Sequence, residues 1–329
     1  MPLASLLAPP IPEPLHVPKA APVDDPEAVR TLHTRAETEM ATWGGKSVQE
    51  EAAALLDDFT LQRFLQARPD GVDAALTMLR ESSRWRAAHG VARSFAALHP
   101  AATDELRHPH HSSARAYFYG GAGGRARDGE TYFVERLGKA DLAGFTREPP
   151  VLQLMLETCA AHFEAIFRTV RMRSAETGKL IKCLVVIDAA GLSLSTLRHI
   201  GIIKQCAAIG KDNFPEGSRR VLIVNAPRTA AAIWAVISPL LPARTRSKVS
   251  IVSARHSAAA LDEMISPEEL PQFLGGRKPD AECWVARAEA VPVGAGASLT
   301  EGRGASGAAA GDRARQAVDV PGVRVVAIS

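Results

Sequence analysis

One stretch in the second half of the chain decides the expected fold. It reads Arg220-Val-Leu-Ile-Val-Asn225, then Thr229-Ala-Ala-Ala-Ile-Trp-Ala-Val-Ile-Ser-Pro-Leu-Leu241, then Lys248-Val-Ser-Ile-Val-Ser253. The first and last runs are short and rich in β-branched residues, which predicts strands, whereas the middle run predicts a helix. Strands joined through a helix pair in parallel by a right-handed crossover. The stretch therefore predicts an α/β fold with a mainly parallel sheet.

The helix expected over Thr229–Leu241 has no polar face, whereas an ordinary surface helix carries a single apolar stripe. Its large apolar side chains surround the helix: Ile233, Trp234, Val236, Ile237, Leu240 and Leu241. The run is far shorter than the roughly 20 apolar residues that cross a bilayer. We therefore expect this helix to be buried in the protein, to cover an apolar ligand, or to touch a membrane surface.

Similar patterns extend the fold on the N-terminal side of this stretch. Further strands are expected at Ala116–Tyr119, Tyr132–Leu137 and Ile181–Ile187, and helices at Leu152–Val170 and Leu194–Lys211. The preceding part is all helical, with helices at Glu27–Thr42, Val48–Asp57, Leu61–Arg68 and Val72–Trp85. The domain prediction is a disordered Pro/Ala-rich arm (1–26), a helical lobe (27–98), an α/β domain (99–280) and a mostly disordered Ala/Gly-rich tail (281–329).

The amino-acid composition argues against several classes of function, nucleic-acid binding among them. The chain has 329 residues, 46% of them hydrophobic, and Lys and Arg exceed Asp and Glu by only three. Without a basic surface or interleaved aromatic residues, we expect no nucleic-acid partner. The four scattered cysteines and the lack of an N-terminal signal pattern indicate a cytoplasmic protein with reduced thiols. No metal site or cofactor is expected, and the chain is expected to be a monomer.

Several short motifs resemble functional sites, but each has a simpler reading. Trp43–Ser47 lacks the first glycine and the preceding strand of a phosphate-binding loop. Gly120–Gly124 is followed by a turn and a strand rather than a helix, so we expect a hairpin loop. His108, His110 and His111 have no metal ligands at suitable spacing. The run Ser266–Glu269 predicts an N-capped helix, with proline in the first turn.

Ser193 follows a predicted core strand, as does the serine of a hydrolase nucleophile elbow. That elbow needs glycines on both sides of the serine, but Ser195 occupies the second glycine position. His199 and His256 are isolated, and no motif marks either of them as the base. An esterase therefore ranks third among the functions considered.

Several segments together resemble the CRAL-TRIO lipid-transfer family, over roughly Leu55–Gly276. The segments that carry the resemblance are Thr60–Arg68, Leu76–Leu79, Trp85-Arg86, Tyr132–Leu142, Val185–Asp188, Gly191–Ser193, Asn213–Glu216, Ile223–Pro227 and Leu270–Gly276. The resemblance implies a helical N-terminal lobe and an α/β lobe whose sheet floors an apolar lipid cavity. Thr229–Leu241 falls at the family's gate helix, which would pack on lipid when shut and meet the bilayer when open.

The resemblance also implies a head-group site for phosphatidylinositol. Members that bind this lipid use residues that match Arg68, Glu216, Thr245 and Lys248. The cations would neutralise phosphate, while Thr245 and Glu216 would orient neighbouring groups and hydroxyls. The alternative is a purely structural ion pair of Glu216 with Arg68 or Lys248.

One departure from the family concerns the strand before Asp188. Members that transfer phosphatidylcholine carry Ser and Thr there, where this chain has Leu184, Val185 and Val186. We therefore expect a non-catalytic, transiently membrane-associated carrier of phosphatidylinositol, and leave a second lipid ligand open. A carrier of a neutral ligand, of the tocopherol or retinoid kind, is the alternative.

Overall fold

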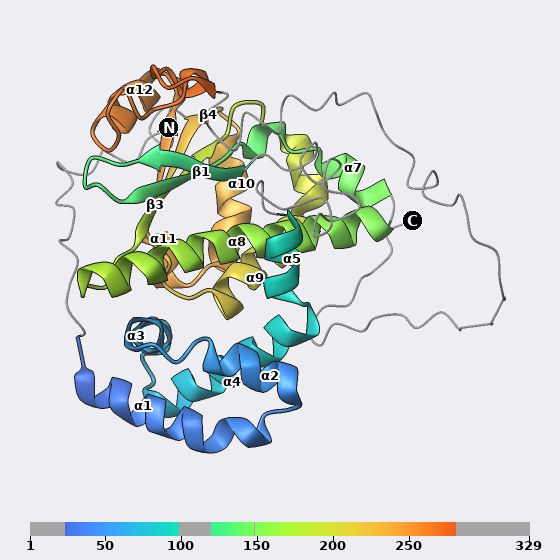
Figure 1. Cartoon of the computed structure of the whole chain (residues 1–329). Helices are drawn as coiled ribbons and strands as arrows, with labels where there is room; N and C mark the ends of the chain where they lie inside the picture. Colours follow the sequence, from blue (N-terminus) through green and yellow to red (C-terminus); the bar gives the residue numbers. More distant parts are fainter. Residues whose placement is uncertain (1–23, 99–119, 148, 281–329) are drawn as a thin grey trace, which may run out of the picture. The chain divides into compact units, whose positions relative to one another are not determined.

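The computed structural model describes residues 24–98, 120–147 and 149–280, which all belong to one compact unit (Figure 1). The expected strand Ala116–Tyr119, the histidines His108, His110 and His111, the tail 281–329 and nearly all of the arm 1–26 lie outside these residues.

Helices form the first part, and their ends follow from local sequence. They are α1 (Pro26–Glu39), η2 (Met40–Thr42), α2 (Lys46–Ala53), α3 (Asp58–Ala67), α4 (Val72–Ala88) and α5 (Val91–Leu98). The carboxylate of Asp57 accepts a hydrogen bond from the Thr60 amide at 2.9 Å, so Asp57 caps α3. The helix expected over Val48–Asp57 therefore ends earlier, at Ala53. Trp43 is buried in the core of these helices and is not part of a phosphate loop.

The sheet has five strands in the order β1-β2-β3-β4-β5. They are β1 (Gly120–Arg125), β2 (Thr131–Glu135), β3 (Cys183–Asp188), β4 (Ser218–Ala226) and β5 (Val249–Ser253). Only β1 and β2 pair antiparallel, and β2 to β5 pair in parallel. The prediction of a mainly parallel α/β sheet is confirmed.

The glycine run Gly120–Gly124 is a strand, so the prediction of a hairpin loop there is wrong. The turn does lie at Asp128-Gly129, where the Gly129 amide donates to the Ala126 carbonyl at 2.9 Å. A Cβ on Gly123 would collide with the ring of Tyr132 on β2. Gly123 therefore has no room for a side chain, because the tyrosine of the neighbouring strand occupies that space, which strand propensity does not reveal.

Helices connect the strands and cover both sides of the sheet. They are η3 (Leu137–Lys139), α7 (Leu142–Arg147), α8 (Pro149–Thr177), η4 (Leu194–His199), α9 (Ile200–Asn213), α10 (Ala230–Ile237), η5 (Ser238–Leu240), α11 (Ala243–Arg246), α12 (Ala254–Asp262) and η6 (Gln272–Leu274). The N-capped helix expected at Ser266–Glu269 is a turn, so this prediction is wrong. The amides of Glu269 and Leu270 both donate to the Ser266 carbonyl, which closes one turn that does not continue.

The two faces of the sheet differ in packing. Leu184, Val186, Leu222 and Val224 point to one face and are fully buried in a core cluster with residues of α12 and the segment after it. Residues of the opposite face alternate with them along β3 and β4, and this face is turned towards α8 (Figure 1). Side chains of the neighbouring helices fill only part of the space against the second face, and the space that remains is the candidate functional site.

Candidate functional site

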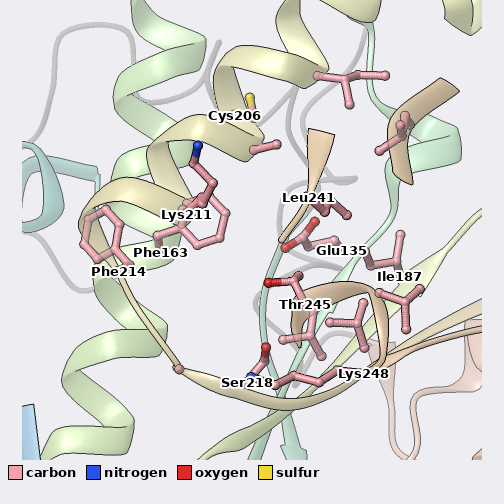
Figure 2. A pocket seen from close by; sticks show the side chains of 18 of the residues that line it. Glu135, Phe163, Ile187, Cys206, Lys211, Phe214, Ser218, Leu241, Thr245 and Lys248 are labelled. Atoms are coloured by element: carbon pink, nitrogen blue, oxygen red, sulfur yellow. The ribbon is translucent and has the colours of Figure 1, made fainter. Parts of the chain in front are cut away.

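A cavity of about 690 Å³ lies between the second face of the sheet and helices α8, α9 and α10. Its wall is mostly apolar, with side chains from each of these elements: Val185, Ile187, Val221, Ile223, Ile251, Met155, Phe163, Ile166, Ile202, Ile233 and Ile237. Figure 2 shows Phe163, Phe214, Ile187 and Leu241 around the open space. The cavity expected beneath Thr229–Leu241 is therefore present.

The helix α10 has one face on the cavity and one on the surface. Ile233, Trp234 and Ile237 line the cavity, as does Leu241 just beyond the helix. Val236 does not line it, and 43% of its surface is exposed. Leu240 is half-buried and is also absent from the wall. Four of the six residues predicted for this helix thus face the cavity, and the helix has an apolar outer face as well.

One end of the cavity is cationic and is organised around Glu216. The Glu216 carboxylate accepts from Lys182 Nζ at 2.5 Å and from Lys248 Nζ at 2.7 Å. Arg244 Nε lies 3.1 Å from the other carboxylate oxygen. Burial alone would raise the pKa of Glu216, but the ammonium groups of Lys182 and Lys248 hold it below its ordinary value. Glu216 is therefore a carboxylate surrounded by three cations.

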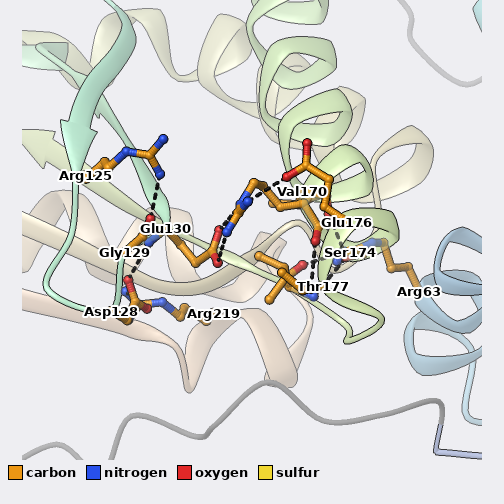
Figure 3. Close-up of polar contacts among 12 residues, drawn as sticks. Arg63, Arg125, Asp128, Gly129, Glu130, Val170, Ser174, Glu176, Thr177 and Arg219 are labelled. Carbon is orange, nitrogen blue, oxygen red and sulfur yellow. Dashed lines mark hydrogen bonds and ion pairs between the residues drawn. The ribbon is translucent and has the colours of Figure 1, made fainter.

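The backbone at Glu216 is fixed by a second, buried arginine. Glu216 has a left-handed backbone, with a φ of 55°. Its carbonyl accepts from Arg63 on α3 at 2.8 Å, and Arg63 also donates to Ser174 Oγ on α8 at 3.1 Å and to the Ile181 carbonyl. Figure 3 shows Arg63 reaching Ser174, which in turn donates to the Val170 carbonyl. Arg63 thus ties the helical part to the loop that carries Glu216.

The four residues predicted for the head-group site all line this cavity: Arg68, Glu216, Thr245 and Lys248. The structural ion pair considered as the alternative is formed by Glu216 with Lys248, and no pair of Glu216 with Arg68 is found among the described residues. The Arg68 guanidinium instead donates to the neighbouring Ala67 carbonyl at 3.1 Å, the only partner the structure shows for it among the described residues. Figure 2 shows Thr245 and Lys248 near Ser218, at the start of β4.

Sequence reasoning missed two cations at this end, Lys182 and Arg244. Lys182 directly precedes β3, and the pairing of Cys183 with Ser218 brings it beside Glu216. That register is not visible in the sequence. Arg244 lies in the motif already noted, one residue before Thr245, and lines the cavity. Burial lowers the pKa of Lys182 to about 8, although Glu216 opposes this change.

The balance of charge at this end favours an anionic ligand. Lys182, Arg244 and Lys248 contact the Glu216 carboxylate, and Arg68 adds a fourth positive charge on the cavity wall without contacting that carboxylate. Partly buried charges of one sign repel one another and are costly unless a counter-charge is present. A phosphate group placed among these side chains would supply it.

The strand residues relevant to phosphatidylcholine do not all face the cavity. Only Val185 of the three lines it, because Leu184 and Val186 point to the opposite face and are fully buried in the core there. Of the three positions compared with the phosphatidylcholine-transferring members, only that of Val185 can therefore contact a ligand in the cavity. The alternation of side chains along β3 explains the difference.

The esterase reading has no support from the position of Ser193. The Ser193 side chain caps η4 in a capping box with Thr196, and its hydroxyl lies 2.6 Å from that of Ser195. His256 instead pairs with Ser253, 3.2 Å away. Within residues 24–98, 120–147 and 149–280, no cluster of ligand-type side chains could hold a metal ion. None of the helices described in these ranges combines the length and apolar character needed to cross a bilayer.

Comparison with known proteins finds several relatives of this chain. The chain is 31% identical over 227 residues to Protein real-time of Anopheles gambiae, which covers 66% of this chain and 31% of that protein. It is 27% identical over 225 residues to the phosphatidylinositol/phosphatidylcholine transfer protein SFH9 of Arabidopsis thaliana, covering 67% and 37%. It is 26% identical over 237 residues to the SEC14 cytosolic factor of Eremothecium gossypii, covering 69% and 71%.

The chain spans about a third of the length of the first two of these relatives. The model of the CRAL/TRIO domain matches residues 116–276, which include β1 to β5, α8 to α12 and three of the four predicted head-group residues. Over residues 116–276, the chain therefore carries a CRAL/TRIO domain.

Proposed function

We propose that this protein carries phosphatidylinositol, with the acyl chains in the apolar cavity and the phosphoinositol head at the cationic end. The observation that carries the proposal is a large apolar chamber with one cationic end, where three cations share one carboxylate and Arg68 adds a fourth positive charge. A phospholipid is the molecule that matches both parts. A relative with that activity in its name, SFH9, supports the same choice.

Transfer by such a carrier needs no chemical step. Exposing acyl chains to water costs about 0.8 kcal/mol for each CH₂ group, and an apolar cavity removes most of that cost. In the proposal, α10 opens at a membrane surface, where the exposed Val236 and the cavity-lining Trp234 enter the boundary of the lipid. The protein acts in the cytoplasm as a monomer, without a cofactor, and meets membranes only transiently.

Glu216 has a defined role in this proposal. It compensates the charges of Lys182, Arg244 and Lys248 when the head-group site is free of phosphate. When phosphate binds, it shares these cations with the carboxylate, and Glu216 can turn to accept from inositol hydroxyls. A neutral ligand of the tocopherol or retinoid kind, by contrast, would leave Arg68 and Lys248 without a ligand contact.

Replacing Lys248 or Arg68 by Ala tests this function. Each change removes a charge-assisted contact, of about 1.5–3 kcal/mol, so we expect phosphatidylinositol affinity to fall about tenfold to a hundredfold. The fold should persist, because Glu216 keeps Lys182 and Arg244 in the first variant and Arg68 makes only a local contact in the second. The measurement is the transfer of labelled phosphatidylinositol between vesicles.

Matched controls are Lys46→Ala, whose side chain is 90% exposed, and Arg277→Ala, which pairs only with exposed Glu268 among the described residues. Both should transfer at the wild-type rate. Unchanged transfer by both head-group variants would contradict the assignment and favour a neutral ligand.

A further inference from the structure

The cavity contains a second polar point, which the phosphate-binding end does not explain. Glu135, the last residue of β2, lines the cavity and lies 3.0 Å from His162 on α8, whose Nε2–H donates to its Oε1. The His162 side chain is only 2% exposed, whereas that of Glu135 keeps 21% exposure. Figure 2 shows Glu135 beside the open space, near Leu241. Glu135 thus places a carboxylate in a part of the cavity wall that is otherwise apolar.

This point is separate from the cationic end. Glu135 pairs with Ile187 near the end of β3, whereas the loop with Glu216 leads into Ser218, which pairs with Cys183 at the start of β3. Cys183 and Ile187 are four positions apart along β3, about 13 Å at a rise of about 3.3 Å per residue. A phosphate held near Glu216 therefore does not reach Glu135.

The groups around Glu135 are neutral or directed elsewhere. Cys159 and Cys206 line the same wall, and a hydrogen bond from the Cys159 thiol to Cys206, burial and the charge of Glu135 all raise the pKa of Cys159, so its thiol stays protonated. The adjacent Arg136 lies over the ring of Phe273, with its guanidinium carbon 4.1 Å from the ring centre. Among the described residues, the structure shows no partner for the second oxygen, Oε2, of Glu135.

We propose that Glu135, oriented by His162, is a second ligand subsite that binds the free hydroxyl of a neutral lipid. An ionised carboxylate only accepts hydrogen bonds, so its ligand must donate one. A phosphodiester is repelled by the carboxylate, and a quaternary ammonium, although attracted by its charge, has no N–H to donate a hydrogen bond. In an apolar chamber, a polar group without a partner is costly, and a lipid hydroxyl removes that cost.

This inference does not rest on the proposed binding of phosphatidylinositol, because the two subsites share no residue. It gives the cavity two ways of holding a lipid: by an anionic head near Glu216, or by a hydroxyl at Glu135. It also assigns selectivity, because a site that hydrogen-bonds a hydroxyl rejects the analogue that lacks the proton.

The test compares dioleoylglycerol, which has one free hydroxyl, with its 3-O-methyl ether. The full chain is incubated with phosphatidylcholine vesicles that contain either compound, and bound lipid is quantified after the vesicles are removed. We expect wild type to bind the alcohol at least tenfold better than the ether. Glu135→Met should lose this preference by weakening alcohol binding, with ether binding unchanged. Glu50→Met, at a site exposed on α2, is the control and should keep the preference.

A second variant keeps the test decisive if Glu135→Met does not fold. Glu135→Gln keeps the size of the side chain but loses its charge, and should reduce the preference. Equal binding of the alcohol and the ether by wild type, or a full preference in either folded variant, would overturn the proposal. Phosphatidylinositol binding should be unaffected in Glu135→Met and weakened in Lys248→Ala, so the failure of one subsite does not imply the failure of the other.

Discussion

Replacing Ile223 by Trp is expected to abolish lipid uptake while leaving the free energy of unfolding within about 1 kcal/mol of wild type. Ile223 lies on the cavity face of β4, between Ile187 on β3 and Ile251 on β5. Overpacking a filled core costs about 1–3 kcal/mol, but here the larger ring enters empty space. It would occupy the space that an acyl chain needs.

Uptake by this variant is measured with labelled phosphatidylinositol, and stability with denaturant titration. Met172→Trp is the matched control, because Met172 on α8 is 56% exposed and does not line the cavity. The control should take up lipid like wild type. If Ile223→Trp folds and still binds lipid at the wild-type level, the lipid lies elsewhere.

Replacing Arg63 by Ala is expected to destabilise the protein by at least about 3 kcal/mol, because several buried acceptors lose their donors at once and each costs about 1–3 kcal/mol. Arg63 is fully buried and donates to the Glu216 carbonyl, Ser174 Oγ and the Ile181 carbonyl. Burial lowers the pKa of Arg63 to about 10, which still leaves it charged at neutral pH. The loss should appear as a lower midpoint in denaturant titration.

Arg68→Ala is the appropriate comparison, because Arg68 ends the same helix and contacts only its neighbour's carbonyl among the described residues. We expect it to change the free energy of unfolding by less than about 1 kcal/mol, as surface substitutions usually do. Arg63 thus supports the site, and Arg68 acts on the ligand. Equal stability of the two variants would show that the contacts of Arg63 do not hold the Glu216 loop in place.

Much of the fold could be predicted from the sequence, because the core strands have a strong local pattern. The runs around Val185, Val221 and Val249 are rich in β-branched residues and are separated by helical segments, which is enough to predict parallel pairing. β1 could not be predicted, because its glycine run has low strand propensity and Gly123 is required by the ring of Tyr132 on another strand. Strand propensity describes a residue's own side chain and not the space that a neighbour takes.

The residues of the head-group site could be predicted from the sequence, but most of the ion pairs and hydrogen bonds between them and their neighbours could not. The family resemblance led to Arg68, Glu216, Thr245 and Lys248, and the structure places them along one cavity. Lys182 could not be predicted, because the register of β3 and β4 brings it beside Glu216. The pair of Glu135 with His162 could not be predicted either, because it depends on how α8 packs against the end of β2. The sequence of the helix over Thr229–Leu241 also did not show which of its apolar sides meets the cavity.

The central claim is that the cavity holds phosphatidylinositol in preference to phosphatidylcholine. Native mass spectrometry of the full chain, after incubation with vesicles containing equal amounts of the two lipids, tests it most directly. We expect one lipid per chain, with the mass of phosphatidylinositol, because the cationic end balances its phosphate and Val185 offers no hydroxyl to a choline lipid. Equal occupancy by the two lipids, or a chain that carries neither, would contradict the claim.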